Sequence, residues 1–314
     1  MTDMYEAAVV GGGIAGLQAA IQLGRYQHKV LVIDKGYGRS TLCRSYHNVL
    51  GWPNGISGPE LRTIGREQAS SLGVLFAEDT IVSARKQDNG HIRLQGARGH
   101  YEAQTLLIAT GILDRFPDLP GIKECLGLSI YVCPDCDGYE VSGRSTIVLG
   151  SGKAGAAMAI LLKDWTDELV FLNHEQKEIP ESWQHKLQDA GIRTVHEAAA
   201  SIHSEAGMLR HVELANGERL EAERGFLAFG GNAVHSDWTR SLGVERMENR
   251  HIVTDPRSKV TNIEGIWAAG DIGVHAEQVS VAMGEGSLAA IWMHKYLKAG
   301  AKSARFPQSS LSDS

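Results

Sequence analysis

Hydrophobic residues are grouped along the chain in a way that predicts a β–α–β unit at its start. A short apolar run ends at Val10 and leads directly into the glycine-rich segment 11–16, after which apolar residues recur at helical spacing. A second strand-like run, 29–33, ends at Asp34. A strand, a glycine-rich turn, a helix and a second strand in this order are typical of a parallel sheet covered by helices.

The same pattern occurs a second time in the middle of the chain. The apolar run 146–149 precedes the glycine-rich segment 150–155, and another apolar run, 169–172, follows the next helical segment. The segment 225–230 also mirrors the segment 106–111, where a buried strand ends in Thr-Gly. The chain therefore contains two units of the same kind.

The positions of these units predict the domain organisation. The second unit interrupts the first, whose remaining strand and C-terminal helix follow at 265–297. We therefore predict an α/β fold of two Rossmann-like domains, the second inserted into the first. We expect the first domain to comprise 1–117 and 247–314, and the second to comprise 118–246.

Composition is that of a soluble globular enzyme. Hydrophobic residues make up 43% and charged residues 22% of the 314 residues, and the formal net charge is −6. This acidity argues against a nucleic-acid partner. No apolar run reaches the roughly 18 residues of a membrane span, and the first residues show no secretory pattern. We therefore expect a cytoplasmic protein that has no membrane partner.

The first glycine segment has the spacing of a dinucleotide-binding loop. Gly11 allows a tight turn, Gly13 allows the backbone to approach a pyrophosphate, and Gly16 allows the helix to pack on the strand. Asp34 follows at the distance expected for a carboxylate that accepts a hydrogen bond from a ribose hydroxyl. The alternatives are a plain glycine turn and an exposed strand-end carboxylate, but the strand, loop, helix and Asp34 in register favour nucleotide binding.

The second glycine segment keeps Gly150, Gly152 and Gly155 as a possible nucleotide loop but differs at the next strand end. The matching strand-end residue is Asn173, and Glu175 follows it closely. The 2′-phosphate of NADPH requires an arginine near this strand end, and none is present there, whereas the glutamates would repel a phosphate. NADPH binding, NADH binding through Glu175, and a loop kept for structure without a nucleotide all stay open, so both nucleotides are doubtful cofactors.

A Cys-x-x-Cys pair lies just before the second unit. Cys133 and Cys136, followed by Asp137, form a motif typical of a redox-active dithiol or half of a metal site. A zinc site needs a second pair of ligands, and Cys43 and Cys125 do not have that spacing, so we expect no metal. A reactive dithiol is favoured over an inert pair because Pro, Asp and Gly are typical of a surface or cleft turn. Asp137 is placed to move a proton to or from a leaving thiolate.

At this point the motifs resemble a known family. The order Gly-x-Gly-x-x-Gly, Thr-Gly, Cys-x-x-Cys-Asp-Gly, a second Gly-x-Gly-x-x-Gly and Ala-Ala-Gly-Asp is similar to that of the low-molecular-weight thioredoxin reductases, over residues 5–297. The resemblance implies a two-domain flavoprotein, normally a homodimer. It implies FAD in the domain formed by 1–117 and 247–314, and an NAD(P)-binding-like domain, 118–246, that carries the Cys-x-x-Cys motif.

The resemblance also assigns roles to single residues. It implies FAD contacts at Gly11, Gly13, Ile14, Ala15, Gly16, Asp34, Asn48, Thr110, Gly111, Gly270, Asp271, Gln278 and Val279. It implies that Cys136 faces the flavin, that Cys133 attacks the substrate disulfide, and that Asp137 is the general acid.

Two departures from the family pattern bear on the electron donor. The His-Arg-Arg stretch of the nucleotide domain is replaced by 173–175, Asn-His-Glu, and the Arg-Gln near the flavin is replaced by 277–278, Glu-Gln. These changes resemble the pyridine-nucleotide-independent branch, whose members take electrons from another donor such as ferredoxin, or form disulfides as oxidases. A tail residue, Phe306, or Trp292 as the second choice, would then cover the flavin; the alternative is a tail without fixed structure.

These observations predict a FAD-dependent disulfide oxidoreductase. Electrons would reach the flavin, pass to the disulfide of Cys133 and Cys136, and leave to a thioredoxin-type protein disulfide, with weak or no use of NADPH. One alternative is an oxidase that forms a disulfide in a small dithiol and passes electrons to oxygen. An alternative from another class is a flavin-binding redox sensor without catalytic activity.

Overall fold

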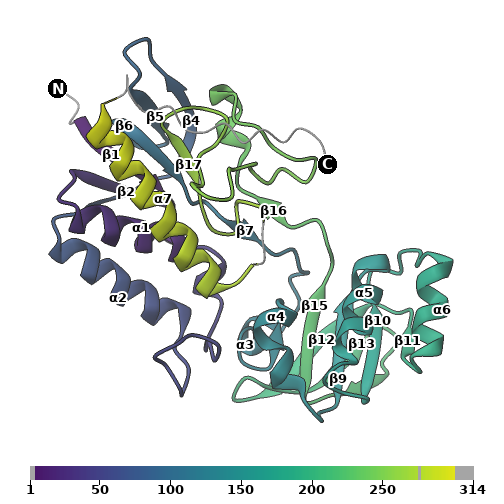
Figure 1. Cartoon of the computed structure of the whole chain (residues 1–314). Helices are drawn as coiled ribbons and strands as arrows, with labels where there is room; N and C mark the ends of the chain where they lie inside the picture. The colour runs from purple at the N-terminus through teal and green to yellow at the C-terminus, as the bar shows by residue number, and fades with distance from the viewer. Residues whose placement is uncertain (1–3, 275–276, 301–314) are drawn as a thin grey trace. The chain divides into compact units, whose positions relative to one another are not determined.

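The computed structural model describes residues 4–274 and 277–300, which form two compact units (Figure 1). Unit 1 comprises Met1–Ser40, Pro59–Leu113 and Val234–Ser314, and unit 2 comprises Thr41–Gly58 and Asp114–Ala233. Both have α/β architecture with parallel strands, and the second is inserted into the first. The predicted fold class is therefore confirmed.

A sheet of seven described strands forms the centre of unit 1. Its parallel strands run in the order β3, β2, β1, β6 and β17. Two antiparallel strands extend the sheet: β5 pairs with the first half of β6, and β4 pairs with β5. The strands are β1 (Met4–Val10), β2 (Val30–Asp34), β3 (Leu75–Glu78), β4 (Ile81–Lys86), β5 (Ile92–Gly96), β6 (His100–Ile108) and β17 (Ile266–Ala268).

The continuous apolar sequence of β1 is explained by burial on both faces of this sheet. Ala7 and Val9 pack into the core beneath the helices, while Ala8 and Val10 pack into the core on the opposite face. The helices of unit 1 are α1 (Ile14–Arg25), α2 (Gly58–Ser71) and α7 (Val279–Ala299), and α1 and α7 lie side by side (Figure 1).

Unit 2 contains a parallel sheet in the order β11, β10, β9, β15 and β8, and a separate antiparallel sheet of β12, β13 and β14. The parallel strands are β8 (Ile130–Tyr131), β9 (Thr146–Gly150), β10 (Leu169–Asn173), β11 (Arg193–Val195) and β15 (Arg224–Ala228). The antiparallel strands are β12 (Ala199–Glu205), β13 (Met208–Leu214) and β14 (Arg219–Glu221). The helices are α3 (Ile122–Cys125), α4 (Pro134–Asp137), α5 (Gly152–Leu162) and α6 (Glu181–Asp189).

Short elements complete the description. Two strands, β7 (Ile112–Leu113) and β16 (Ala233–Val234), pair with each other where the chain crosses between the units. The short 3₁₀ helices are η1 (Arg39–Thr41), η2 (Gly138–Val141) and η3 (Asp237–Leu242). Among the helices of the described residues, none combines the length and the apolar character needed to cross a membrane.

The structure places the domain boundaries differently from the sequence-based expectation. The chain returns to unit 1 at Val234 rather than at 247, because Leu242 and Val244 pack with Ile81 in the core of unit 1. The segment Thr41–Gly58, expected in the first domain, groups with unit 2. The sequence does not show which of two cores an apolar residue of a connecting segment enters. The return of the chain to unit 1 at Val234 could therefore not be located from the sequence pattern.

Candidate functional site

The first glycine loop closes tightly between β1 and α1. A Cβ at Gly11 (φ +109°) would overlap the carbonyl oxygen of Ala109, and one at Gly16 would overlap the carbonyl oxygen of Gly11. At Gly13, by contrast, no described heavy atom lies within 4 Å of where a Cβ would be. The loop therefore packs closely on its protein side and is open at Gly13, which is the shape that a pyrophosphate at a helix N-terminus requires.

Helix α1 begins directly after Gly13, so the backbone N–H groups of Ile14 and Ala15 belong to its first turn. These N–H groups lack carbonyl partners within the helix and favour an anionic ligand. Asp34, at the end of β2, lies close to Gly12: a Cβ there would come within 2.8 Å of the Asp34 carboxyl carbon. The predicted pyrophosphate and ribose residues are thus brought together.

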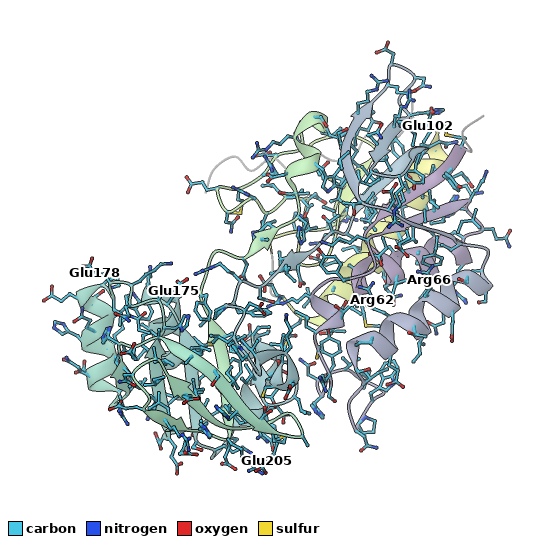
Figure 2. The ribbon with its side chains drawn as sticks, turned by 180° about the vertical axis from the view of Figure 1, so that it is seen from behind. Arg62, Arg66, Glu102, Glu175, Glu178 and Glu205 are labelled. Carbon is cyan, nitrogen blue, oxygen red and sulfur yellow. The ribbon has the colours of Figure 1, made fainter. Side chains whose placement is uncertain are left out.

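An arginine of α2 holds Asp34 in place. Arg62 Nη2 donates a hydrogen bond to Asp34 Oδ2 at 2.8 Å, and both side chains are largely buried. The same guanidinium reaches the carbonyl oxygen of Gly36. Arg62 and Arg66 extend from the same helix (Figure 2). Sequence analysis did not single out Arg62, because its contact with Asp34 depends on how α2 packs.

Thr110 and Gly111 follow β6 at the carboxyl edge of the sheet. Thr110 Oγ1 donates a hydrogen bond to the carbonyl oxygen of His235 at 2.7 Å, and the backbone N–H of His235 donates to the carbonyl oxygen of Gly111 at 3.2 Å. The hydroxyl of Thr110 therefore fixes the end of β6 to the returning chain.

Gly270 and Asp271 form a turn that Glu285 of α7 supports. The backbone N–H of Gly270 donates to Glu285 Oε2 at 3.0 Å, and Lys259 Nζ forms an ion pair with Glu285 Oε1 at 2.6 Å. Asp271 Oδ2 lies 3.3 Å from Arg39 Nη1. Glu285 is buried although it is charged, and because a buried charge requires a partner, this ion pair fixes the Gly270 turn.

The remaining predicted FAD residues are not all in the same unit. Gln278 is the N-cap residue of α7, where its carbonyl oxygen accepts from Ala282 N at 2.9 Å, and Val279, the first residue of the helix, is buried. Asn48 is exposed, and its segment groups with unit 2 instead of unit 1.

Two aromatic residues, Phe306 and Trp292, were the candidates to cover the flavin. Phe306 lies outside the described residues. Trp292 is partly buried against the core shared by α1 and α7, and Lys295 Nζ lies 4.2 Å from the centre of its ring. Trp292 is thus part of the packing of unit 1.

The dithiol lies on a single tight turn in unit 2. Cys133 precedes the first residue of α4, and its carbonyl oxygen accepts from the N–H groups of Cys136 at 3.2 Å and Asp137 at 3.0 Å. This turn places the two sulfur atoms 2.8 Å apart. Cys133 is buried and Cys136 is half-buried. Two sulfurs this close can form a disulfide, whose S–S bond is about 2.05 Å, with little movement.

Unit 2 contains a further thiol, that of Cys43, which is half-buried. Burial, with the negative charges of Asp137 and Cys133, raises the pKa of the Cys43 thiol to about 12. Cys43 is therefore held as the neutral thiol near the dithiol turn. Cys43 belongs to the segment Thr41–Gly58, which groups with unit 2 although it is distant in sequence. The spacing of the cysteines in the sequence therefore does not indicate that Cys43 interacts with Cys133.

The second glycine loop differs from the first in what surrounds it. The backbone N–H of Gly152, the first residue of α5, donates to Asn173 Oδ1 at 2.9 Å. A Cβ at Gly152 would lie 3.1 Å from the carbonyl oxygen of Glu178 and 3.3 Å from Lys177 Cβ. The chain after β10 therefore lies against this loop, and its first helical N–H group already has a partner. Gly155 keeps its packing role, since a Cβ there would overlap the Phe171 ring.

Glu175 is held by cations from two segments. Arg115 donates two parallel hydrogen bonds to its carboxylate, Nη1 to Oε1 at 2.7 Å and Nη2 to Oε2 at 3.0 Å, and Lys177 Nζ lies 2.8 Å from Oε2. The Arg115 guanidinium, with Lys177, holds the pKa of Glu175 well below its usual range. Sequence analysis considered Glu175 as a ribose acceptor and did not find Arg115, which is distant in sequence.

No metal-binding group is apparent in the described parts of the chain, 4–274 and 277–300: no three His, Cys, Asp or Glu side chains there are placed to bind one ion.

Comparison with known proteins identifies the family. The model of the pyridine nucleotide-disulphide oxidoreductases matches residues 5–286, so the chain belongs to this family of oxidoreductases. Within this family, the chain is a low-molecular-weight thioredoxin reductase-like FAD oxidoreductase. The predicted family and the prediction of an enzyme are both confirmed.

Relatives match over nearly their whole length. The chain is 28% identical over 321 residues to thioredoxin reductase of Peptoclostridium litorale, covering 95% of this chain and 98% of that protein. It is 29% identical over 304 residues to thioredoxin reductase of Treponema pallidum, covering 92% and 96%. The crystal structure of an oxidoreductase from Agrobacterium tumefaciens is 28% identical, with a TM-score of 0.77 and coverage of 93% and 98%.

Family membership supports FAD as the cofactor, and unit 1 fits it. The open position at Gly13, the first turn of α1 and the carboxylate of Asp34 are suited to the pyrophosphate and the ribose.

Proposed function

We propose that this enzyme passes electrons from FAD through the Cys133–Cys136 pair to a thioredoxin-type protein disulfide, with weak or no use of NADPH. The observation that carries the proposal is the 2.8 Å separation of the two sulfurs on one turn. That separation suits a pair that alternates between dithiol and disulfide.

The exchange needs two thiols and one acid. When bound and reduced by the electron donor, FAD would supply the two electrons that, together with two protons, convert the Cys133–Cys136 disulfide to the dithiol. The Cys133 thiolate then attacks one sulfur of the substrate disulfide, and Asp137 protonates the thiolate that leaves. Cys136 attacks Cys133 in the mixed disulfide and releases the second substrate thiol. The substrate disulfide is thereby reduced to two thiols, and the enzyme pair is oxidised.

The weak use of NADPH is supported by the second glycine loop. A dinucleotide requires free N–H groups at the start of the helix and, for NADPH, a cation for the 2′-phosphate. In unit 2 the Gly152 N–H is bonded to Asn173, and a carboxylate, Glu175, follows the strand end. We therefore propose a different electron donor, such as ferredoxin. A homodimer, as the family resemblance implies, belongs to the same proposal.

An anaerobic stopped-flow experiment tests this function. The FAD-loaded enzyme is reduced with dithionite, freed of excess reductant and mixed with oxidised thioredoxin, and new thiols are counted with a chromogenic disulfide. Thiol formation in stoichiometric amount is expected. A parallel mixture of oxidised enzyme with NADPH is expected to leave the flavin absorbance unchanged over the same time. Failure to form thiols, with oxygen uptake driven by a small dithiol, would support the oxidase alternative instead.

A further inference from the structure

We infer that Arg115 and Lys177 form an anion site at the second glycine loop, and that Glu175 occupies this site with its own carboxylate. The inference rests on the proposed function in one respect, the weak use of NADPH, because it names the residues that prevent NADPH from binding. The ligand class that would compete with Glu175 is a phosphate monoester attached to an adenosine ribose.

Arg115 is fixed in position independently of Glu175. Its Nε donates to the carbonyl oxygen of Gly230 at 2.9 Å, and its Nη2 donates to the carbonyl oxygen of Phe229 at 2.9 Å. Its backbone N–H also donates to Asn232 Oδ1 at 3.2 Å. The guanidinium is thus held at the chain that follows β15, and removal of the carboxylate would leave a positive group in place.

The ion pair crosses the edge of the sheet where nucleotides bind in this type of fold. In the strand order, β9 lies between β10 and β15, and its carboxyl end leads into the glycine loop. Glu175 follows β10, and the carbonyl groups that fix Arg115 follow β15. The Arg115–Glu175 pair therefore joins the chains on both sides of the glycine loop. Ligands of parallel α/β sheets bind outside the carboxyl ends of the strands, which is the location of this pair.

Charge and geometry match those of a phosphate site. A guanidinium that donates two parallel hydrogen bonds, together with an ammonium group 2.8 Å from the same carboxylate, is the donor set that binds phosphate monoesters. A carboxylate presents two oxygens to this fork as a phosphate does. Glu175 therefore acts as an internal substitute for the ligand and repels any phosphate that approaches.

The test compares two glutamates that lie in the same segment. Glu175 and Glu178 both follow β10 (Figure 2), and Glu178 has an exposed side chain. The FAD-loaded variants Glu175→Ala and Glu178→Ala are titrated with adenosine 2′-monophosphate in a calorimeter at low salt. We expect Glu175→Ala to bind about tenfold more tightly than the parent, and Glu178→Ala to bind as the parent does. Binding is measured without turnover, so the result does not depend on the disulfide activity.

A second variant assigns the gain to the arginine. In Arg115→Ala/Glu175→Ala the tighter binding is expected to be lost. If Glu175→Ala melts at a lower temperature than the parent, Glu175→Gln, which keeps the side-chain shape, replaces it in the comparison. Equal affinity of the parent and of the Glu175 variant for adenosine 2′-monophosphate would overturn the inference. Tighter binding that persists in Arg115→Ala/Glu175→Ala would also overturn it. Failure of the thioredoxin experiment with a positive titration would refute the proposed function alone.

Discussion

The side-chain oxygen Oδ1 of Asn173 accepts a hydrogen bond of 2.9 Å from the backbone N–H of Gly152. This bond uses the first N–H group of α5, at the position where a dinucleotide-binding loop presents free N–H groups to a pyrophosphate. The corresponding glycine of unit 1, Gly13, faces open space within the described residues. Two loops with the same glycine spacing thus differ in whether a ligand can approach them.

Replacement of Cys136 with serine is expected to stop thiol release from a thioredoxin-type disulfide. Without the second thiol, the mixed disulfide at Cys133 cannot be resolved, so it is expected to accumulate and to be visible by mass spectrometry. The control is Cys43→Ser, which removes a thiol that the exchange does not use and is expected to keep the parent rate. A Cys136→Ser enzyme that releases thiols at the parent rate would exclude the dithiol from the reaction.

Alanine substitutions at two glycines of α7 are expected to have different effects on stability. A Cβ at Gly286 would overlap the carbonyl oxygen of Ala15 in α1, so Gly286→Ala is expected to destabilise the fold by about 1–3 kcal/mol and to weaken FAD retention. A Cβ at Gly284 would meet no described atom within 4 Å beyond its chain neighbours and the nearby backbone of its own helix, so Gly284→Ala is expected to be neutral or stabilising by up to about 1 kcal/mol. Melting temperature and bound FAD are measured for both. Equal loss in the two variants would contradict the close contact of α1 with α7.

The fold could be predicted from the sequence, but the side-chain contacts of the site could not. The apolar run of β1 and the glycine spacing are local patterns, and they correctly predicted the fold. The contacts of Arg115 with Glu175 and of Glu285 with Gly270 join residues that are 60 and 15 positions apart in the chain and that belong to different elements. A charged residue in a sequence does not show which partner it meets, because that depends on how the elements pack.

Acid sensitivity is expected to depend on the hydrogen bond between Tyr101 and Asp79. Burial alone would raise the pKa of Asp79, but hydrogen bonds from the Tyr101 hydroxyl at 2.9 Å and from the backbone N–H groups of Thr80 and Arg98 outweigh it and lower the pKa. A carboxyl group whose pKa is lowered in the folded state stabilises the fold above its unfolded pKa. This stabilisation is lost as the pH falls through the folded pKa.

Tyr101→Phe is therefore expected to cost about 1–2 kcal/mol of unfolding free energy at pH 7. The cost is expected to shrink in acid, as the pH falls through the folded pKa of Asp79 in the variant and then through its lower value in the parent. Urea unfolding at pH 7 and near pH 3 measures both values, and Tyr139→Phe, at a largely exposed tyrosine, is the control. A cost that is independent of pH would contradict this assignment.

The Cys43 thiol is expected to react slowly with iodoacetamide. Its pKa is raised to about 12 by burial and by the neighbouring charges of Asp137 and Cys133. At pH 8 the reactive thiolate is then a fraction of about 10⁻⁴. Mass spectrometry of the reduced, folded enzyme is expected to find Cys43 unlabelled after a time that labels it fully in urea. Complete labelling in the folded enzyme would show that the thiol is accessible and ionised.

The central claim is that FAD and the Cys133–Cys136 pair of one chain exchange two electrons. An anaerobic titration with dithionite, followed by flavin absorbance, tests it most directly. The parent enzyme is expected to take up about four electrons per chain, two for the flavin and two for the disulfide, and the Cys136→Ser variant about two. Uptake of about two electrons by both proteins would contradict the claim, since the sulfur pair would then receive none.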